Sequence, residues 1–250
     1  MIPEALFDQK ELNSTVIKEI SLKLGATIVG FGDVSTGLAK EFRHMPTAIS
    51  LAIKHPFPED ALENSTGAQT VYLHHYPELD RTLEGIQKRI VKWLRGLGWR
   101  ALAIPPYSDR IDARFIAKLY PLFPHKTAAT CAGLGWIGKN GLLVNSTFGA
   151  RLSWATILTD APLAVSETPL YSSRCGACRR CVDACPVGAL LNVKWSRSKP
   201  NRPLVNFDAC RSQLAKNHQE TGVFACGQCI LACRKGSSCH PLFFSQASQS

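Results

Sequence analysis

The stretch that decides the fold is Cys175-Gly-Ala-Cys178-Arg-Arg-Cys181-Val-Asp-Ala-Cys185-Pro186. Its four cysteines are separated by two, two and three residues, and a proline follows the last one. Two-residue spacing lets one tight loop supply three thiolates to an iron–sulfur cubane, while the fourth cysteine reaches a neighbouring cluster. The stretch therefore predicts a domain folded around two [4Fe–4S] clusters.

A second group of cysteines completes the ligand set. It reads Cys226-Gly-Gln-Cys229-Ile-Leu-Ala-Cys233-Arg234, with Cys210 sixteen residues upstream. By the bacterial ferredoxin pattern, the fourth cysteine of each run crosses to the other cluster. That pattern assigns one cluster to Cys175, Cys178, Cys181 and Cys233, and the other to Cys185, Cys210, Cys226 and Cys229. Zinc is the alternative, but a zinc site takes only four thiolates and this segment supplies eight.

Composition narrows the class of protein. The 250 residues are 45% hydrophobic and 19% charged, which excludes disordered, collagen-like and coiled-coil chains. No stretch approaches the roughly 20 apolar residues that span a bilayer, and the N-terminal MIPEALFDQKELNS lacks the features of a signal peptide. Ten cysteines without an export signal favour metal or redox chemistry over disulfides. We expect a soluble, cytoplasmic protein without a membrane partner.

The positive charge is concentrated in the cysteine-rich part. Residues 174–235 carry 11 Lys and Arg against 3 Asp and Glu, whereas residues 1–173 carry 18 against 16. Thiolate-ligated clusters would offset about half of the excess of the cysteine-rich part. The remainder suits a low-potential, acidic electron donor such as a ferredoxin or flavodoxin, or the phosphates of RNA.

The first 160 residues alternate helical and strand patterns, which predicts a mixed α/β domain. Strands are expected over residues 26–30, 47–53 and 100–104. Helices are expected from a cap at Asn13 or Ser14 to Gly25, and over residues 78–97, 112–120 and 125–132. A hairpin is expected to pair residues 141–145 with 153–158, and residues 161–173 are expected to connect the two parts of the chain.

A glycine-rich segment precedes that connection. From Ala132 to Leu163 the chain reads AGLGWIGKNGLLVNSTFGARLSWATILTDAPL. Its glycines would let the backbone approach a ligand closely, and Lys139 would neutralise an anionic group there. Glycines around the start of a strand also have a purely structural explanation, so this pattern alone leaves both open.

Taken in order and spacing, three motifs and the cysteine runs resemble the epoxyqueuosine reductase family over roughly residues 70–235. The motifs are Gly133-Leu-Gly-Trp-Ile-Gly-Lys139, Leu142-Leu143 and Leu158-Thr-Asp-Ala-Pro-Leu163. That family joins a nitroreductase-like, cobalamin-binding α/β domain to a bacterial-type two-[4Fe–4S] ferredoxin domain, and is related to the reductive dehalogenases. The resemblance implies an α/β (α+β) cofactor and substrate domain over residues 1–165, a ferredoxin-like domain over 166–236 and a flexible tail over 237–250. We expect a short form that lacks the helical-repeat domain of many members.

The resemblance also implies a reaction. Electrons would pass from an external donor through the two clusters to a corrinoid, whose cob(I) state reduces the substrate. The residues that would line the corrinoid are Gly133, Gly135, Trp136, Gly138, Lys139 and Asn145. A flavin is the alternative cofactor, because nitroreductase-like domains hold either, and tRNA is the substrate of the family.

One catalytic feature of the family is missing here. Members carry a proton-donating aspartate in an Asp-Ser-Ala-Pro motif just before the glycine motif, but this chain reads LYPLFPHKTAATCAGLGW and has no acid there. The candidate proton donors are therefore Tyr107, Asp109, Asp112 and His125. A histidine donates a proton near neutral pH, although one that opens a helix often has a structural role.

Two other classes of function fit the same sequence. The first is an electron-transfer or activating protein, whose clusters reduce a corrinoid or another redox centre of a partner protein. The second is an RNA-binding protein in which the clusters are structural. Bound corrinoid discriminates the enzyme from both of them.

Overall fold

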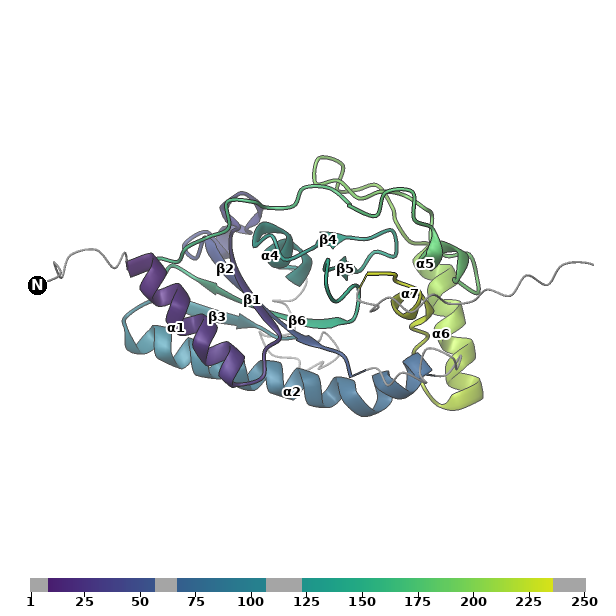
Figure 1. Cartoon of the computed structure of the whole chain (residues 1–250), viewed down its shortest axis with the longest axis horizontal. Coiled ribbons are helices and arrows are strands. Elements are labelled where there is room, and N and C mark those ends of the chain that lie inside the picture. The colour runs from purple at the N-terminus through teal and green to yellow at the C-terminus, as the bar shows by residue number, and fades with distance from the viewer. Residues whose placement is uncertain (1–8, 57–66, 107–122, 236–250) are drawn as a thin grey trace, which may run out of the picture.

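The computed structural model describes residues 9–56, 67–106 and 123–235. Its first part is a four-stranded antiparallel sheet with helices on both faces (Figure 1). The strands lie in the order β1 (Ile28–Asp33), β2 (Thr47–Lys54), β6 (Leu152–Thr159) and β3 (Ala101–Ile104). Helices α1 (Gln9–Lys23) and α2 (Gly67–Gly96) cover one face, and α4 (His125–Cys131) covers the other. Two short 3-10 helices, η1 (Ser35–Gly37) and η2 (Lys40–Phe42), connect β1 to β2.

The cysteine-rich part lies at one end of the sheet (Figure 1). It contains the short helices α5 (Arg180–Asp183) and α7 (Gln228–Leu231) and the longer α6 (Phe207–Thr221). A small hairpin of β4 (Trp136–Ile137) and β5 (Leu143–Val144) lies between the sheet and this part. The α/β fold class and the order of the two parts expected from the sequence are confirmed.

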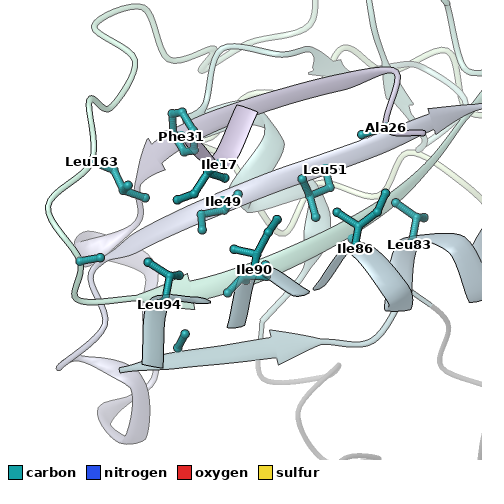
Figure 2. Packing of buried hydrophobic residues seen from close by; sticks show 14 of the residues in the cluster. Ile17, Ala26, Phe31, Ile49, Leu51, Leu83, Ile86, Ile90, Leu94 and Leu163 are labelled. Carbon is teal, nitrogen blue, oxygen red and sulfur yellow. The ribbon is translucent and has the colours of Figure 1, made fainter. Parts of the chain in front are cut away.

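The main core forms between the sheet and the pair α1 and α2. Because side chains alternate along a strand, Ile49 and Leu51 of β2 point to this core, while Ala48 packs on the α4 side. Helix α2 presents Leu83, Ile86, Ile90 and Leu94 to the same core, all with 1% exposure or less (Figure 2). The period-two and period-3.6 patterns of the sequence are thus both satisfied at one interface.

Helix α2 begins earlier than the predicted start at residue 78. It runs from Gly67, with Pro77 inside it, over 30 residues. Proline lacks the N–H of a helical ladder, which is why the sequence pattern placed the start after it. At 1.5 Å per residue the helix is about 45 Å long. Its first turns reach the cysteine-rich part, where Thr221 Oγ1 donates a hydrogen bond to Gln69 Oε1 (3.3 Å).

The predicted cap of the first helix is wrong. Asn13 and Ser14 lie within α1 and are buried. Asn13 Nδ2 donates to Pro162 O (3.0 Å), and Ser14 Oγ accepts the N–H of Ala164 (2.8 Å). These cap-forming residue types instead fasten the helix to the segment that follows β6, a contact 150 residues away that local sequence does not reveal.

The predicted hairpin of residues 141–145 with 153–158 is also wrong. Strand β5 pairs with β4, and β6 occupies the middle of the sheet between β2 and β3. Asn145 and Gly149 do close a tight turn through reciprocal backbone hydrogen bonds of 2.8 and 3.0 Å. The alternation of residues 153–158 fits pairing with any strand, so it specified a strand without specifying its partner.

Other sequence expectations are met where the structure describes the chain. The strands and the helix that begins at His125 lie within a few residues of their predicted bounds, whereas the helix over 112–120 and the tail over 237–250 lie outside the described residues. The boundary between residues 165 and 166 stays a prediction, and packing crosses it: Trp136 and Ala150 share a hydrophobic cluster with Leu170, Cys175 and Cys233. Among the described helices, none has both the length and the apolar character of a membrane span.

Candidate cluster and cofactor site

The cysteines gather into two groups of four. Burial, together with the nearby thiolates of Cys175, Cys233 and Cys178, raises the pKa of the Cys181 thiol to about 11. We call this group the first cluster site; it consists of Cys175, Cys178, Cys181 and Cys233.

Burial likewise raises the pKa of Cys229 to about 12, helped by thiolates that include Cys226, Cys210 and Cys185. We call this group the second cluster site; it consists of Cys185, Cys210, Cys226 and Cys229. Cys181 also acts on Cys229, so the two sites adjoin. We define the two sites by the ferredoxin pattern, and which four thiols bind each cluster stays a prediction.

The chemistry of these thiols suits iron–sulfur clusters. Thiols with raised pKa values keep their protons at neutral pH unless a metal displaces them. Within the described residues, no three His, Cys, Asp or Glu side chains are placed to share a single metal ion. In a [4Fe–4S] cubane each of the four thiolates binds a different iron, so no single metal ion has to bind more than one of them.

Local backbone geometry sets the cysteine loops. Gly176 and Gly227 take positive φ angles of 57° and 73°, which side-chain-bearing residues adopt rarely. Gly176 lies in the turn that follows Cys175, and Gly227 is the N-cap of α7. Cys178 N donates to Cys175 O across the first turn (3.1 Å). In α6, the side chain of Asn206 accepts the N–H of Ala209 (3.1 Å), and this cap fixes the first turn in which Cys210 lies.

The segment from Trp136 to Asn140 bridges the sheet part to both cysteine loops. Trp136 Nε1 donates to Cys175 Sγ (3.4 Å), and the buried Lys139 donates through Nζ to Cys178 O (2.8 Å). Asn140 Nδ2 donates to Cys229 O (3.3 Å). Lys139 was predicted to neutralise an anionic ligand, but the structure places its ammonium against the first cysteine loop.

Arg151 forms a further link that sequence reasoning missed. Its side chain is 6% exposed, and Nη2 donates to Leu231 O (3.2 Å), two residues before Cys233. Burial lowers the pKa of the Arg151 guanidinium, and the charge of the Cys233 thiolate opposes that shift. No motif marks this arginine, because its importance depends on the fold that brings β6 beside α7.

The glycine motif packs against the protein itself. A Cβ added to Gly135 would lie 2.6 Å from Val144 O, and one added to Gly138 would lie 2.7 Å from Val144 Cγ2. Gly133 has φ of 71°, and its Cβ would lie 2.8 Å from Ser166 Oγ. These glycines are therefore explained by close backbone packing in the β4–β5 hairpin, and a role in lining a cofactor stays a prediction.

Asn145 has its polar atoms engaged locally. Its Oδ1 accepts the N–H groups of Thr147 (2.8 Å) and Phe148 (3.0 Å), and its Nδ2 donates to Leu134 O (2.6 Å). This side chain closes the turn that brings Gly149 against the second cysteine run, where a Cβ would lie 3.5 Å from Cys233 Sγ. Its predicted contact with a corrinoid stays a prediction.

The candidate acid His125 is buried under the sheet. Its Nδ1 lies 2.9 Å from Thr156 Oγ1 and its Nε2 lies 2.8 Å from Pro105 O, so Nε2 carries the donated proton. Burial lowers its pKa to about 4, against a smaller rise from the Pro105 carbonyl. The ring is neutral at pH 7, which favours a structural role over proton donation. Tyr107, Asp109 and Asp112 lie outside the described residues.

Comparison with known proteins joins these observations. Residues 174–236 match the family model of the 4Fe-4S double cluster binding domain. The chain is 35% identical over 199 residues to the epoxyqueuosine reductase of Cyclobacterium marinum, covering 70% of this chain and 60% of that protein. The chain is a homologue of the epoxyqueuosine reductases. A second such reductase, from Leadbetterella byssophila, is 28% identical over 201 residues, covering 78% of this chain and 60% of that protein. The chain thus spans about 60% of the length of these relatives.

Solved structures extend the likeness to the fold. An epoxyqueuosine reductase bound to an epoxyqueuosine-modified tRNA-Tyr stem loop superposes with a TM-score of 0.59 at 17% identity, covering 89% of this chain and 64% of that one. A reductive dehalogenase whose structure suggested a mechanism for B12-dependent dehalogenation superposes with a TM-score of 0.64 at 19% identity, covering 95% and 34%. Epoxyqueuosine reductases and dehalogenases therefore share this architecture.

Proposed function

We propose that this protein is a corrinoid-dependent iron–sulfur reductase of the epoxyqueuosine reductase type. The observation that carries the proposal is the grouping of eight cysteines into two adjoining four-thiol sites that contact the sheet part directly through Trp136, Lys139 and Arg151. Homology to the epoxyqueuosine reductases supplies the reaction class.

The described residues fit two [4Fe–4S] clusters. Each site offers four thiols, and apolar side chains such as Leu190 and Val205 pack around the second one. When bound, the clusters supply one-electron carriers at low potential. The protein's own part is to hold the thiols and to fix them against the sheet.

The corrinoid rests on a different kind of support. Close packing against the chain's own atoms also explains the glycine positions predicted to line it, so these glycines do not themselves support the corrinoid. The corrinoid is inferred from the relatives, one of which is described by its B12-dependent dehalogenation. A flavin has no support among them. When bound, a corrinoid would supply a strongly reducing cobalt centre.

The substrate that the relatives favour is a tRNA stem loop bearing epoxyqueuosine. Reduction of an epoxide to an alkene consumes two electrons and two protons and releases water. The electrons would come from a low-potential donor, a ferredoxin or flavodoxin, for which the basic composition of residues 174–235 is suited. The protons need an acid other than His125, whose burial keeps it neutral.

The test is turnover by the reconstituted protein. The chain is loaded anaerobically with iron, sulfide and cobalamin, reduced chemically, and mixed with an epoxyqueuosine-modified tRNA-Tyr stem loop. We expect conversion to queuosine that requires cobalamin and is lost in Cys178→Ala. Bound corrinoid without conversion would reject this substrate. If the protein binds no corrinoid and converts no substrate, the electron-transfer alternative is favoured.

A further inference from the structure

The sheet part places two side chains at the first cluster site. Trp136, which is 4% exposed, directs its indole Nε1–H to Cys175 Sγ over 3.4 Å. Arg151 is held by its bond to Leu231 O and lies close enough to the Cys233 thiolate for their charges to interact. Both residues lie in the polypeptide before the cysteine-rich part, and both act on cysteines of the same site.

The chain just before β6 lies beside Cys233. Ala150 shares a hydrophobic cluster with Cys233, and a Cβ on Gly149 would lie 3.5 Å from Cys233 Sγ. In the second cluster site, the donor that the described residues give to a ligand sulfur is the N–H of Ala189, which lies 3.2 Å from Cys185 Sγ. Each site thus has one N–H donor to sulfur among the described residues, and the first site has a buried guanidinium near its thiols as well.

This asymmetry has a direct electrostatic consequence. A [4Fe–4S]²⁺ core that takes up one electron gains one negative charge, which spreads over its sulfurs. N–H donors and a nearby cation stabilise the reduced form more than the oxidised form, so they raise the reduction potential. Low dielectric strengthens the effect, since Trp136 and Arg151 are both buried.

We propose that Trp136 and Arg151 hold the reduction potential of the first cluster site above that of the second. The first cluster is then the preferred resting place of an electron. This inference rests on the proposed function for its direction of electron flow, but the potentials themselves exist without corrinoid or substrate.

The experiment is a redox titration followed by EPR in single-cluster backgrounds. Cys210→Ala leaves the first site with its four thiols, and Cys233→Ala leaves the second. Adding Trp136→Phe removes one N–H donor and keeps an apolar ring. We expect this substitution to lower the reduction potential of the first cluster, with a threefold to tenfold fall in the equilibrium constant for its reduction. A tenfold fall corresponds to about 59 mV for one electron. The second cluster should not respond.

Two further variants separate tuning from general damage. Arg151→Gln removes the charge and should lower the same potential, with the effect larger at low ionic strength. Trp99→Phe is the matched control, because Trp99 packs against the main core between α2 and β3 and should leave both potentials unchanged. An unaltered first potential in Trp136→Phe, or equal shifts in both clusters, would overturn the proposal whether or not the protein reduces a substrate.

Discussion

Removal of one cysteine from each site tests the division of the eight thiols. In Cys233→Ala the first cluster site keeps three thiols and the second keeps four, and in Cys210→Ala the reverse holds. In an uncrossed arrangement, Cys233 would instead share a cluster with Cys226 and Cys229, and both variants would damage the same cluster. The two variants therefore distinguish the crossed arrangement from an uncrossed one.

The size of the effect follows from the ligand count. A full complement is about eight irons and eight sulfides per chain, so loss of one complete cluster leaves about four of each. Retention of a three-iron cluster in the damaged site would leave about seven irons. The absorbance of the reconstituted protein in the thiolate-to-iron charge-transfer bands should fall by up to half.

We would count the clusters per chain by iron and sulfide analysis, EPR and absorbance on anaerobically reconstituted protein. Cys131→Ala is the matched control, because Cys131 is buried between α4 and the sheet and belongs to neither site. It should keep about eight irons. The decisive comparison is a double variant: Cys175→Ala with Cys233→Ala should lose at most the first cluster and keep about four irons. Loss of both clusters in that double variant would refute the crossed assignment.

Three further predictions concern packing, pH and the bridge to the cysteine loops. Gly135→Ala should lower the free energy of unfolding by about 1–3 kcal/mol, because its added Cβ has no room. Gly96→Ala is the control: its Cβ would have nothing within 4 Å and should not lower the stability. Thermal melts of both variants measure the difference. His125 and His55 have folded pKa values of about 4 and an ordinary value of 6.5, so the unfolded chain binds more protons between them, and stability should fall as pH drops from about 6.5 to 4. His125→Gln should flatten that dependence in melts at pH 4.5 to 7.5, and an equally steep curve would contradict it. Lys139→Met should lower iron retention during gel filtration, because Cys178 O loses its donor.

Sequence patterns predicted the parts of this protein that depend on spacing. The cysteine runs indicate two clusters because the intervals between the cysteines determine which cluster geometry they can bind. The alternation of Ile49, Leu51 and Ile53 predicted a strand whose buried face the structure confirms. Both signals are local, so one sequence is enough to see them.

The missed features depend on long-range contacts. Asn13 and Ser14 have the residue types of a cap, but they bond to a segment 150 residues away. Arg151 carries no motif and acquires its position from the pairing of β6 with β2 and β3. The hydrogen bond from Lys139 to Cys178 O likewise joins segments that are 39 residues apart. Which surfaces come together is a property of the whole fold.

The measurement that tests the central proposal most directly is an anaerobic titration of the cluster-loaded protein with cobalamin, followed by absorbance and EPR. We expect tight one-to-one binding, with cobalt that is reduced when electrons are supplied through the clusters and is not reduced in Cys178→Ala. Absence of binding, or reduction of cobalt at the same rate without the clusters, would contradict a corrinoid reductase and leave the protein as an electron carrier for a partner.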